Sequence, residues 1–150
     1  MKIYLASDHA GFKLKQSVEN FLKEEGYLTE DVGVESESRA SWAEYGAKGA
    51  EFVSKDPENS RGIIICGTGL GMSMVSNKFK NVRAALCTNE YMAEMSRKHN
   101  NANVLNMGAR VLTEDLALRI VKIWMDTPFE GGRHAERLDQ LKEVEDNNFK

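Results

Sequence analysis

Short apolar runs alternate along the chain with longer stretches in which apolar residues recur every three or four positions. The short runs lie at 3–6, 28–32, 62–66, 82–87 and 103–107. The third run contains Ile63, Ile64 and Ile65, and three β-branched residues in succession suit a strand that is buried on both faces. This alternation is typical of a parallel sheet covered by helices. The pattern therefore predicts an α/β fold, a three-layer α/β/α sandwich around a five-stranded parallel, Rossmann-like sheet.

Helices are expected between the runs. The first ends at Gly26 and carries apolar residues at i, i+4, i+7 and i+8, namely Leu14, Val18, Phe21 and Leu22. Others are expected over 42–55, after the glycines at 67–71, after the N-cap residues Asn89 and Thr113, and over about 134–145. We find no internal repeat or linker. Residues 1–150 are therefore expected to form a single domain.

Composition narrows the class of protein. The chain has 150 residues, of which 41% are hydrophobic and 29% charged, as in ordinary soluble domains. A net charge of −3 argues against a nucleic-acid-binding surface, and no apolar stretch approaches the roughly 20 residues that cross a bilayer. The N-terminal stretch from Met1 to Asp8 places a charge too early for the apolar core of a signal peptide, and Cys66 and Cys87 form no spaced framework. We expect a cytoplasmic protein that binds neither nucleic acid nor membrane.

Polar clusters follow three of the expected strands. They are Asp8-His9, the stretch from Cys66 to Gly71, and Gly108-Ala109-Arg110. In parallel α/β sheets, ligands bind outside the carboxyl ends of the strands. The three clusters are therefore expected to meet at one edge of the sheet.

The glycine loop is the first candidate site. Alternating glycines in Gly67-Thr68-Gly69-Leu70-Gly71 let the backbone present N–H groups outward as an anion-binding nest. A plain strand-to-helix turn is the alternative reading. Two other phosphate-binding motifs are excluded, because a dinucleotide fingerprint needs glycine where Met72 stands and a Walker loop needs Gly-Lys-Ser/Thr.

Cys66 stands directly before this loop. N–H donors beside a cysteine favour its thiolate, so we expect a lowered pKa for Cys66. A cysteine in an apolar strand is more often an inert packing residue, a reading that suits Cys87. Phosphatase-like use of the thiolate would want an arginine where Met72 stands. The thiolate could instead act as a base.

The histidines and arginines outside these clusters permit several readings. His9, His99 and His134 lie at no metal-binding spacing from one another or from a cysteine, so no metal site is expected. His99 could be a proton shuttle or a solvated helix-terminal residue. Arg133 and Arg137 are four apart, so on a helix they could grip one phosphate, although surface arginines are usually only solvated.

Four motifs resemble the ribose-5-phosphate isomerase type B family in order and spacing along essentially the whole chain. They are Ser-Asp-His-Ala-Gly-Phe-Lys-Leu-Lys at 7–15, Cys-Gly-Thr-Gly-Leu-Gly-Met-Ser at 66–73, Ser-Arg-Lys-His-Asn at 96–100 and Glu-Gly-Gly-Arg-His at 130–134. The family includes relatives acting on allose and galactose phosphates. The resemblance implies a cofactor-free aldose–ketose isomerase that interconverts ribose 5-phosphate and ribulose 5-phosphate through a cis-enediolate. It also implies a homodimer, or a tetramer of paired dimers, with the C-terminal helix packing on a partner subunit.

The resemblance also implies residue roles. Cys66 would remove the C2 proton, Thr68 would move a proton between O1 and O2, and His99 would assist ring opening. Backbone N–H groups of 67–71 would stabilise the enediolate. The substrate-binding residues would be Asp8, His9, Gly67, Gly69, Leu70, Gly71, Asn100, Arg110, Arg133 and Arg137. In the family the pocket lies between two subunits, which both contribute residues.

One segment departs from the family pattern. Relatives usually carry Asp-Tyr-Pro where this chain has Ser41-Trp42-Ala43. In the family this segment lies near the sugar, so the departure bears on whether the substrate is a tetrose, pentose or hexose phosphate, although Trp42 could simply pack the start of its helix.

A non-catalytic phosphosugar-binding protein is a different class of function. It would need no base, so the presence of Cys66, Thr68 and His99 together argues against it. A thiol hydrolase is weakened by the lack of a nearby orienting partner.

Overall fold

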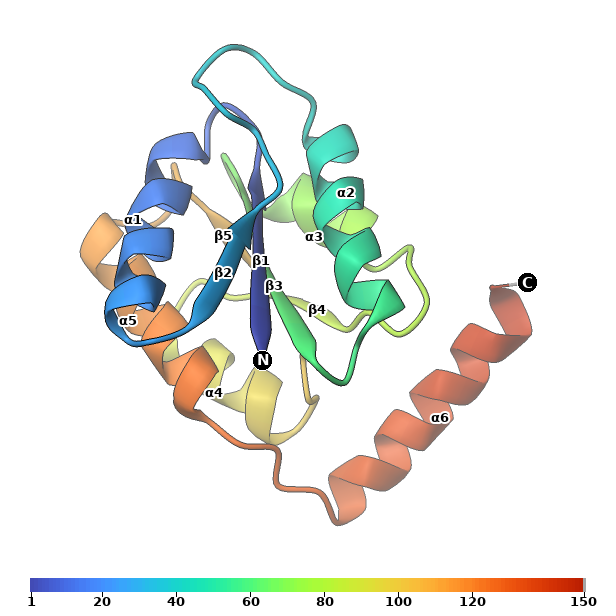
Figure 1. Cartoon of the computed structure of the whole chain (residues 1–150). Coiled ribbons are helices and arrows are strands. Elements are labelled where there is room, and N and C mark those ends of the chain that lie inside the picture. The colour runs from blue at the N-terminus through green and yellow to red at the C-terminus, as the bar shows by residue number, and fades with distance from the viewer. Residues whose placement is uncertain (150) are drawn as a thin grey trace.

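The computed structural model describes residues 1–149, and the expected α/β fold is confirmed (Figure 1). Within these residues five strands pair in parallel, in the order β2-β1-β3-β5-β4. The strands are β1 (Lys2–Ser7), β2 (Leu28–Asp31), β3 (Ser60–Cys66), β4 (Ala84–Leu86) and β5 (Val104–Gly108). The helices are α1 (Phe12–Glu24), α2 (Trp42–Lys55), α3 (Leu70–Ser76), α4 (Glu90–Lys98), α5 (Glu114–Asp126) and α6 (Arg133–Asn148).

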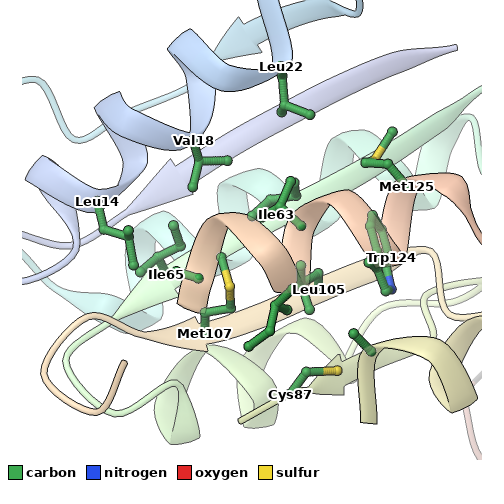
Figure 2. Packing of buried hydrophobic residues seen from close by; sticks show 14 of the residues in the cluster. Leu14, Val18, Leu22, Ile63, Ile65, Cys87, Leu105, Met107, Trp124 and Met125 are labelled. Atoms are coloured by element: carbon green, nitrogen blue, oxygen red, sulfur yellow. The ribbon is translucent and has the colours of Figure 1, made fainter. Parts of the chain in front are cut away.

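The central strand β3 separates two hydrophobic cores. Ile63 and Ile65 point to the face covered by α1 and α5, and Figure 2 shows them among side chains of those two helices. Ile64 points to the opposite face, where α2 and α3 pack. Alternate residues of a strand face opposite sides, so an unbroken isoleucine run fills both cores.

Most of the observed elements differ from the expected ranges by one to three residues at their ends, as β4 and α6 illustrate. The strand expected over 82–87 is reduced to Ala84–Leu86, at the edge of the sheet. There the side-chain amide of Asn77 donates to the carbonyl of Ala84 (3.0 Å) and accepts from its N–H (2.9 Å), so a side chain replaces a neighbouring strand. Helix α6 continues to Asn148, beyond the expected end near 145. The caps are confirmed: Asn89 accepts from the N–H of Met92, and Thr113 from the N–H of Leu116.

The direction of the chain assigns each loop to one edge of the sheet. In a parallel sheet each connecting helix runs back against the strands, so it ends at their amino edge. The loops after β1, β3 and β5 therefore lie at the carboxyl edge, toward the top of Figure 1, whereas α4 and α5 end at the amino edge. Helix α6 begins near the end of α4, and none of its residues is buried. Toward its other end, Oε1 of Glu145 accepts from the N–H of Asn81 (2.8 Å), a residue that precedes β4. Within the described residues, no helix has the length and apolar character needed to cross a membrane.

Candidate active site

Cys66 ends strand β3 and is only 4% exposed. The N–H of Gly69 donates to its sulfur, with a nitrogen–sulfur distance of 3.1 Å. Gly69 has φ = +83°, in the left-handed region, and a Cβ there would overlap the side chain of Leu86, so the loop requires glycine at this position. The loop therefore directs a backbone N–H at the sulfur of Cys66, for which the sequence left both a base and a nucleophile open.

The loop after β5 is joined to the glycine loop. The N–H groups of Ala109 and Arg110 donate to the carbonyls of Cys66 (2.8 Å) and Gly67 (2.9 Å). The Arg110 guanidinium lies against Gly67, with its Nη1 atom 3.2 Å from the point where a Cβ would stand. Thr68 is exposed, and its hydroxyl accepts from the N–H of Leu70 (3.2 Å). A cationic side chain and a free hydroxyl proton thus lie at the glycine loop.

Asp8 and His9 adjoin the same loop. Asp8 is 6% exposed, its N–H donates to the carbonyl of Ile65 (3.3 Å), and its Oδ1 accepts from the N–H of Gly11 (3.1 Å). Nδ1 of His9 lies 3.1 Å from the backbone nitrogen and 3.3 Å from the carbonyl oxygen of Ala40, so the ring of His9 is held against the segment that precedes α2. The three polar clusters that follow the strands therefore lie together at the carboxyl edge.

The segment that departs from the family pattern also borders this edge. Trp42 begins α2 and remains 45% exposed. Its indole covers Gly71, since a Cβ on Gly71 would lie 2.6 Å from Cδ2 of the ring. Ser41 caps α2 by accepting from the N–H of Glu44 (3.2 Å). Trp42 is therefore a wall of the glycine loop as well as the start of a helix.

The remaining sequence-predicted residues lie at the opposite edge. His99 is the C-cap of α4, Asn100 follows it in an exposed turn, and Arg133 and Arg137 are exposed on α6. Helix α4 ends at the amino edge, whereas Cys66 ends a strand at the carboxyl edge. One chain therefore does not bring His99, Asn100 and the two α6 arginines together with Cys66.

The sequence analysis missed two residues beside His99. The rings of His99 and His134 are stacked, with centroids 4.1 Å apart and planes 14° from parallel, and Oε2 of Glu130 lies 3.8 Å from Nε2 of His134. Their place in the Glu-Gly-Gly-Arg-His motif, next to Arg133, was the available signal. By donor type, His99, Glu130 and His134 could bind a metal. Nearly parallel rings direct their nitrogen lone pairs side by side, however, so as arranged the three donors do not converge on one point.

The second cysteine has a different environment. Cys87 is 1% exposed and packs in the core between the sheet and α5. Burial raises its pKa to about 11, against an ordinary value near 9. At neutral pH its thiol is protonated, which fits the expected packing role.

The family follows from comparison with known proteins. The model of the ribose/galactose isomerase family matches residues 3–141. The chain belongs to this family. Its relatives include the ribose-5-phosphate isomerase B of Escherichia coli, 40% identical over 96% of each chain, and the D-erythrulose-4-phosphate isomerase of Pectobacterium atrosepticum, 35% identical over 94% of this chain and 93% of the relative. The resemblance drawn from the four motifs is therefore confirmed.

Solved structures of the family agree with the fold. The ribose-5-phosphate isomerase B of Clostridium thermocellum superposes with a TM-score of 0.94 at 48% identity, over 98% of this chain and 99% of the other. That of Mycoplasma genitalium, with bound ribulose-5-phosphate, also has a TM-score of 0.94, at 36% identity over 97% and 96% of the two chains. Family membership makes this chain a sugar-phosphate isomerase of the aldose–ketose class.

Proposed function

We propose that the chain interconverts ribose 5-phosphate and ribulose 5-phosphate through a cis-enediolate, with Cys66 as the base. The observation that carries the proposal is the Cys66 sulfur, held at the end of the central strand with the Gly69 N–H donated to it at 3.1 Å. Moving a carbonyl from C1 to C2 needs a base beside the reacting carbons and donors for the developing oxyanion. The glycine loop supplies both from one short segment.

The proton steps can be assigned to the same loop. The Cys66 thiolate takes the proton from C2 of the open aldose, and the resulting thiol returns a proton to C1. The Thr68 hydroxyl, exposed at the loop, moves a proton from O2 to O1, so no charge or electron is gained or lost overall. Backbone N–H groups of the loop stabilise the enediolate between these steps.

The phosphate would be bound by cations from both edges of the sheet. Arg110 lies against Gly67, and the ring of His9 is held near the same loop by its contact with Ala40. Arg133 and Arg137, four residues apart on α6, would hold the same phosphate. Because the phosphate does not react, its binding energy can orient the reacting carbons.

We propose further that the site forms between two copies of the chain. Two observations support this. His99, Asn100, Arg133 and Arg137 lie at the edge opposite Cys66. No residue of helix α6 is buried, Leu141 and Val144 on it are 50% and 58% exposed, and between α6 and Asn81 to Arg83 lies an apolar groove of about 360 Å³. Packing of α6 on a second copy would cover this apolar surface and bring the two groups of residues together. A cytoplasmic location, where thiols stay reduced, is part of the same proposal.

A second candidate keeps the chemistry and changes the sugar. Trp42 narrows the space beside the glycine loop, because its indole covers Gly71. One relative, 35% identical to this chain, is named for a four-carbon substrate, D-erythrulose 4-phosphate. A tetrose phosphate would need less room beside the indole than a pentose phosphate.

A panel of aldose phosphates with four, five and six carbons tests both candidates. We expect the highest kcat/KM for ribose 5-phosphate, with deuterium from heavy water appearing at C2 of the aldose. Highest activity on the tetrose phosphate would favour the second candidate. Binding without turnover of any member of the panel would contradict both.

A further inference from the structure

The ring of His134 lies face to face with that of His99. His99 ends α4, and its N–H donates to the carbonyl of Met95 (2.9 Å), whereas His134 stands in the first turn of α6. Their ring centroids are 4.1 Å apart and their planes 14° from parallel. The side chain of His134 is only 13% exposed. The stack is therefore a covered contact between segments that are distant in sequence.

The backbone before α6 is shaped to make this contact. The N–H of Glu130 donates to the carbonyl of Lys98 (3.1 Å), which ties the segment to the last residue of α4. Gly131 and Gly132 follow with φ of +72° and +58°, and a Cβ on either would meet nothing. Glycine is therefore favoured at these two positions by the positive φ angles of the turn, and not by a lack of space for a side chain. The turn delivers His134 onto the ring of His99.

We propose that His134 is a positioning residue, which holds the His99 imidazole in the orientation needed to move a proton during opening of the sugar ring. This inference rests on the proposed function, which assigns ring opening to His99. A histidine side chain rotates about two bonds, and its second torsion has broad preferences. The flat ring of His134, stacked on one face of the His99 ring, fixes the plane of the His99 imidazole and with it the directions of the two ring nitrogens. His134 thereby acts on the reaction only through His99.

The surroundings of His134 disfavour a positive charge on its ring. His134 faces His99 and the cations Arg133 and Arg137, with the carboxylate of Glu130 opposing them. Burial, followed by the charges of His99 and Arg133, lowers the pKa of His134 below its ordinary value. Near neutral pH His134 is therefore the uncharged partner in the stack. As the pH falls through the lowered pKa of His134, its ring becomes charged beside Arg133 and Arg137, which weakens the stack.

A double-mutant cycle tests whether His134 acts through His99. The variants are His134→Ala, His99→Asn and both together, assayed on cyclic ribose 5-phosphate and on ribulose 5-phosphate, whose esterified C5 hydroxyl keeps it open. Misplacement of a reacting group by about 1 Å can cost on the order of a hundredfold. We expect His134→Ala to lower aldose turnover by about ten- to a hundredfold and ketose turnover less. The double variant should match His99→Asn alone. Glu136→Ala, at an exposed position of the same helix, is the matched control and should leave both rates unchanged.

The pH profile of His134→Phe separates positioning from general support of the fold. Phenylalanine keeps a flat ring on His99 but cannot be charged. Turnover near neutral pH should stay within about threefold of the parent, and activity should persist further toward pH 5, within the range where histidine titrates. Equal loss on both substrates, multiplication of the two single effects, or a phenylalanine variant as slow as the alanine variant would overturn the proposal. If His99→Asn leaves aldose turnover unchanged, the ring-opening role proposed for His99 fails first and the role of His134 fails with it.

Discussion

The two edges of the sheet hold their functional side chains in different ways. At the carboxyl edge, Asp8 directly follows β1 and Cys66 is the last residue of β3. They are 6% and 4% exposed, and each accepts a backbone N–H at 3.1 Å. At the amino edge, His99 stands at a helix end, and Arg133 and Arg137 are exposed on α6, a helix of which no residue is buried. The carboxyl edge is therefore fixed within one chain, whereas the amino edge presents its residues outward.

This difference indicates how the steps of the reaction could be divided between the two edges of the sheet. A base must be held rigidly against the carbon that it deprotonates, and the end of a buried strand provides that rigidity. Phosphate-binding and ring-opening groups presented outward can serve the pocket of another copy. The comparison can be tested by removing groups from each edge in turn.

The largest effect is expected from removal of the base at the carboxyl edge. Cys66→Ala should lower kcat by about 10²–10⁴-fold, the usual contribution of a positioned acid–base group. The matched control is Cys87→Ala, which removes a buried thiol whose pKa of about 11 keeps it protonated. That variant should retain full kcat. Steady-state kinetics in both directions, with substrate affinity measured by calorimetry, would show whether only turnover is lost. A Cys66→Ala protein with full activity would exclude Cys66 as the base.

A smaller effect is expected from the arginines of the amino edge. A hydrogen bond to a charged group contributes roughly 1.5–3 kcal/mol, so Arg137→Ala should lower kcat/KM by about ten- to a hundredfold. Turnover should fall together with affinity, because the phosphate orients the reacting carbons. Arg133→Ala should behave in the same way, since both arginines are exposed on α6.

Mixing two defective proteins then tests whether the edges of different chains share a site. Heterodimers of Cys66→Ala with Arg137→Ala would contain one pocket with both defects and one with neither. Random exchange in a two-fold dimer should therefore restore about a quarter of the parent activity. Continued low activity after subunit exchange has been demonstrated by mass spectrometry would show that each chain builds its own site.

The sequence predicted the carboxyl edge better than the amino edge for a physical reason. Strand β3 and its glycine loop are local features, since the isoleucine run and the alternating glycines are adjacent in the chain. Helix α2 likewise begins and ends at the expected residues, Trp42 and Lys55. Local patterns of this kind need no knowledge of distant contacts.

The stack of His99 on His134 is not local. It depends on positive φ angles at Gly131 and Gly132 and on a hydrogen bond from Glu130 to Lys98, which join two distant segments. The spacing of the three histidines gave no indication of it, because His99 ends α4 and His134 stands on α6, far apart along the chain. The shortened β4 was missed for a similar reason, since the side chain of Asn77 competes for its edge.

The smallest effect, confined to the carboxyl edge, is expected at Trp42. The indole covers Gly71 and is 45% exposed, so the smaller ring in Trp42→Tyr would enlarge the pocket and add a hydroxyl without removing a reacting group. Differences of one methylene in a pocket are worth roughly 1–3 kcal/mol, so the ratio of kcat/KM between four- and five-carbon aldose phosphates should move about tenfold or more toward the longer sugar.

Trp124→Tyr would not be a suitable control, because that indole is fully buried in the core. Tyr91→Phe is suitable, since it alters a 70%-exposed aromatic residue on α4 and should leave the ratio unchanged. An unchanged ratio in Trp42→Tyr, at normal thermal stability, would show that Trp42 only packs the start of α2.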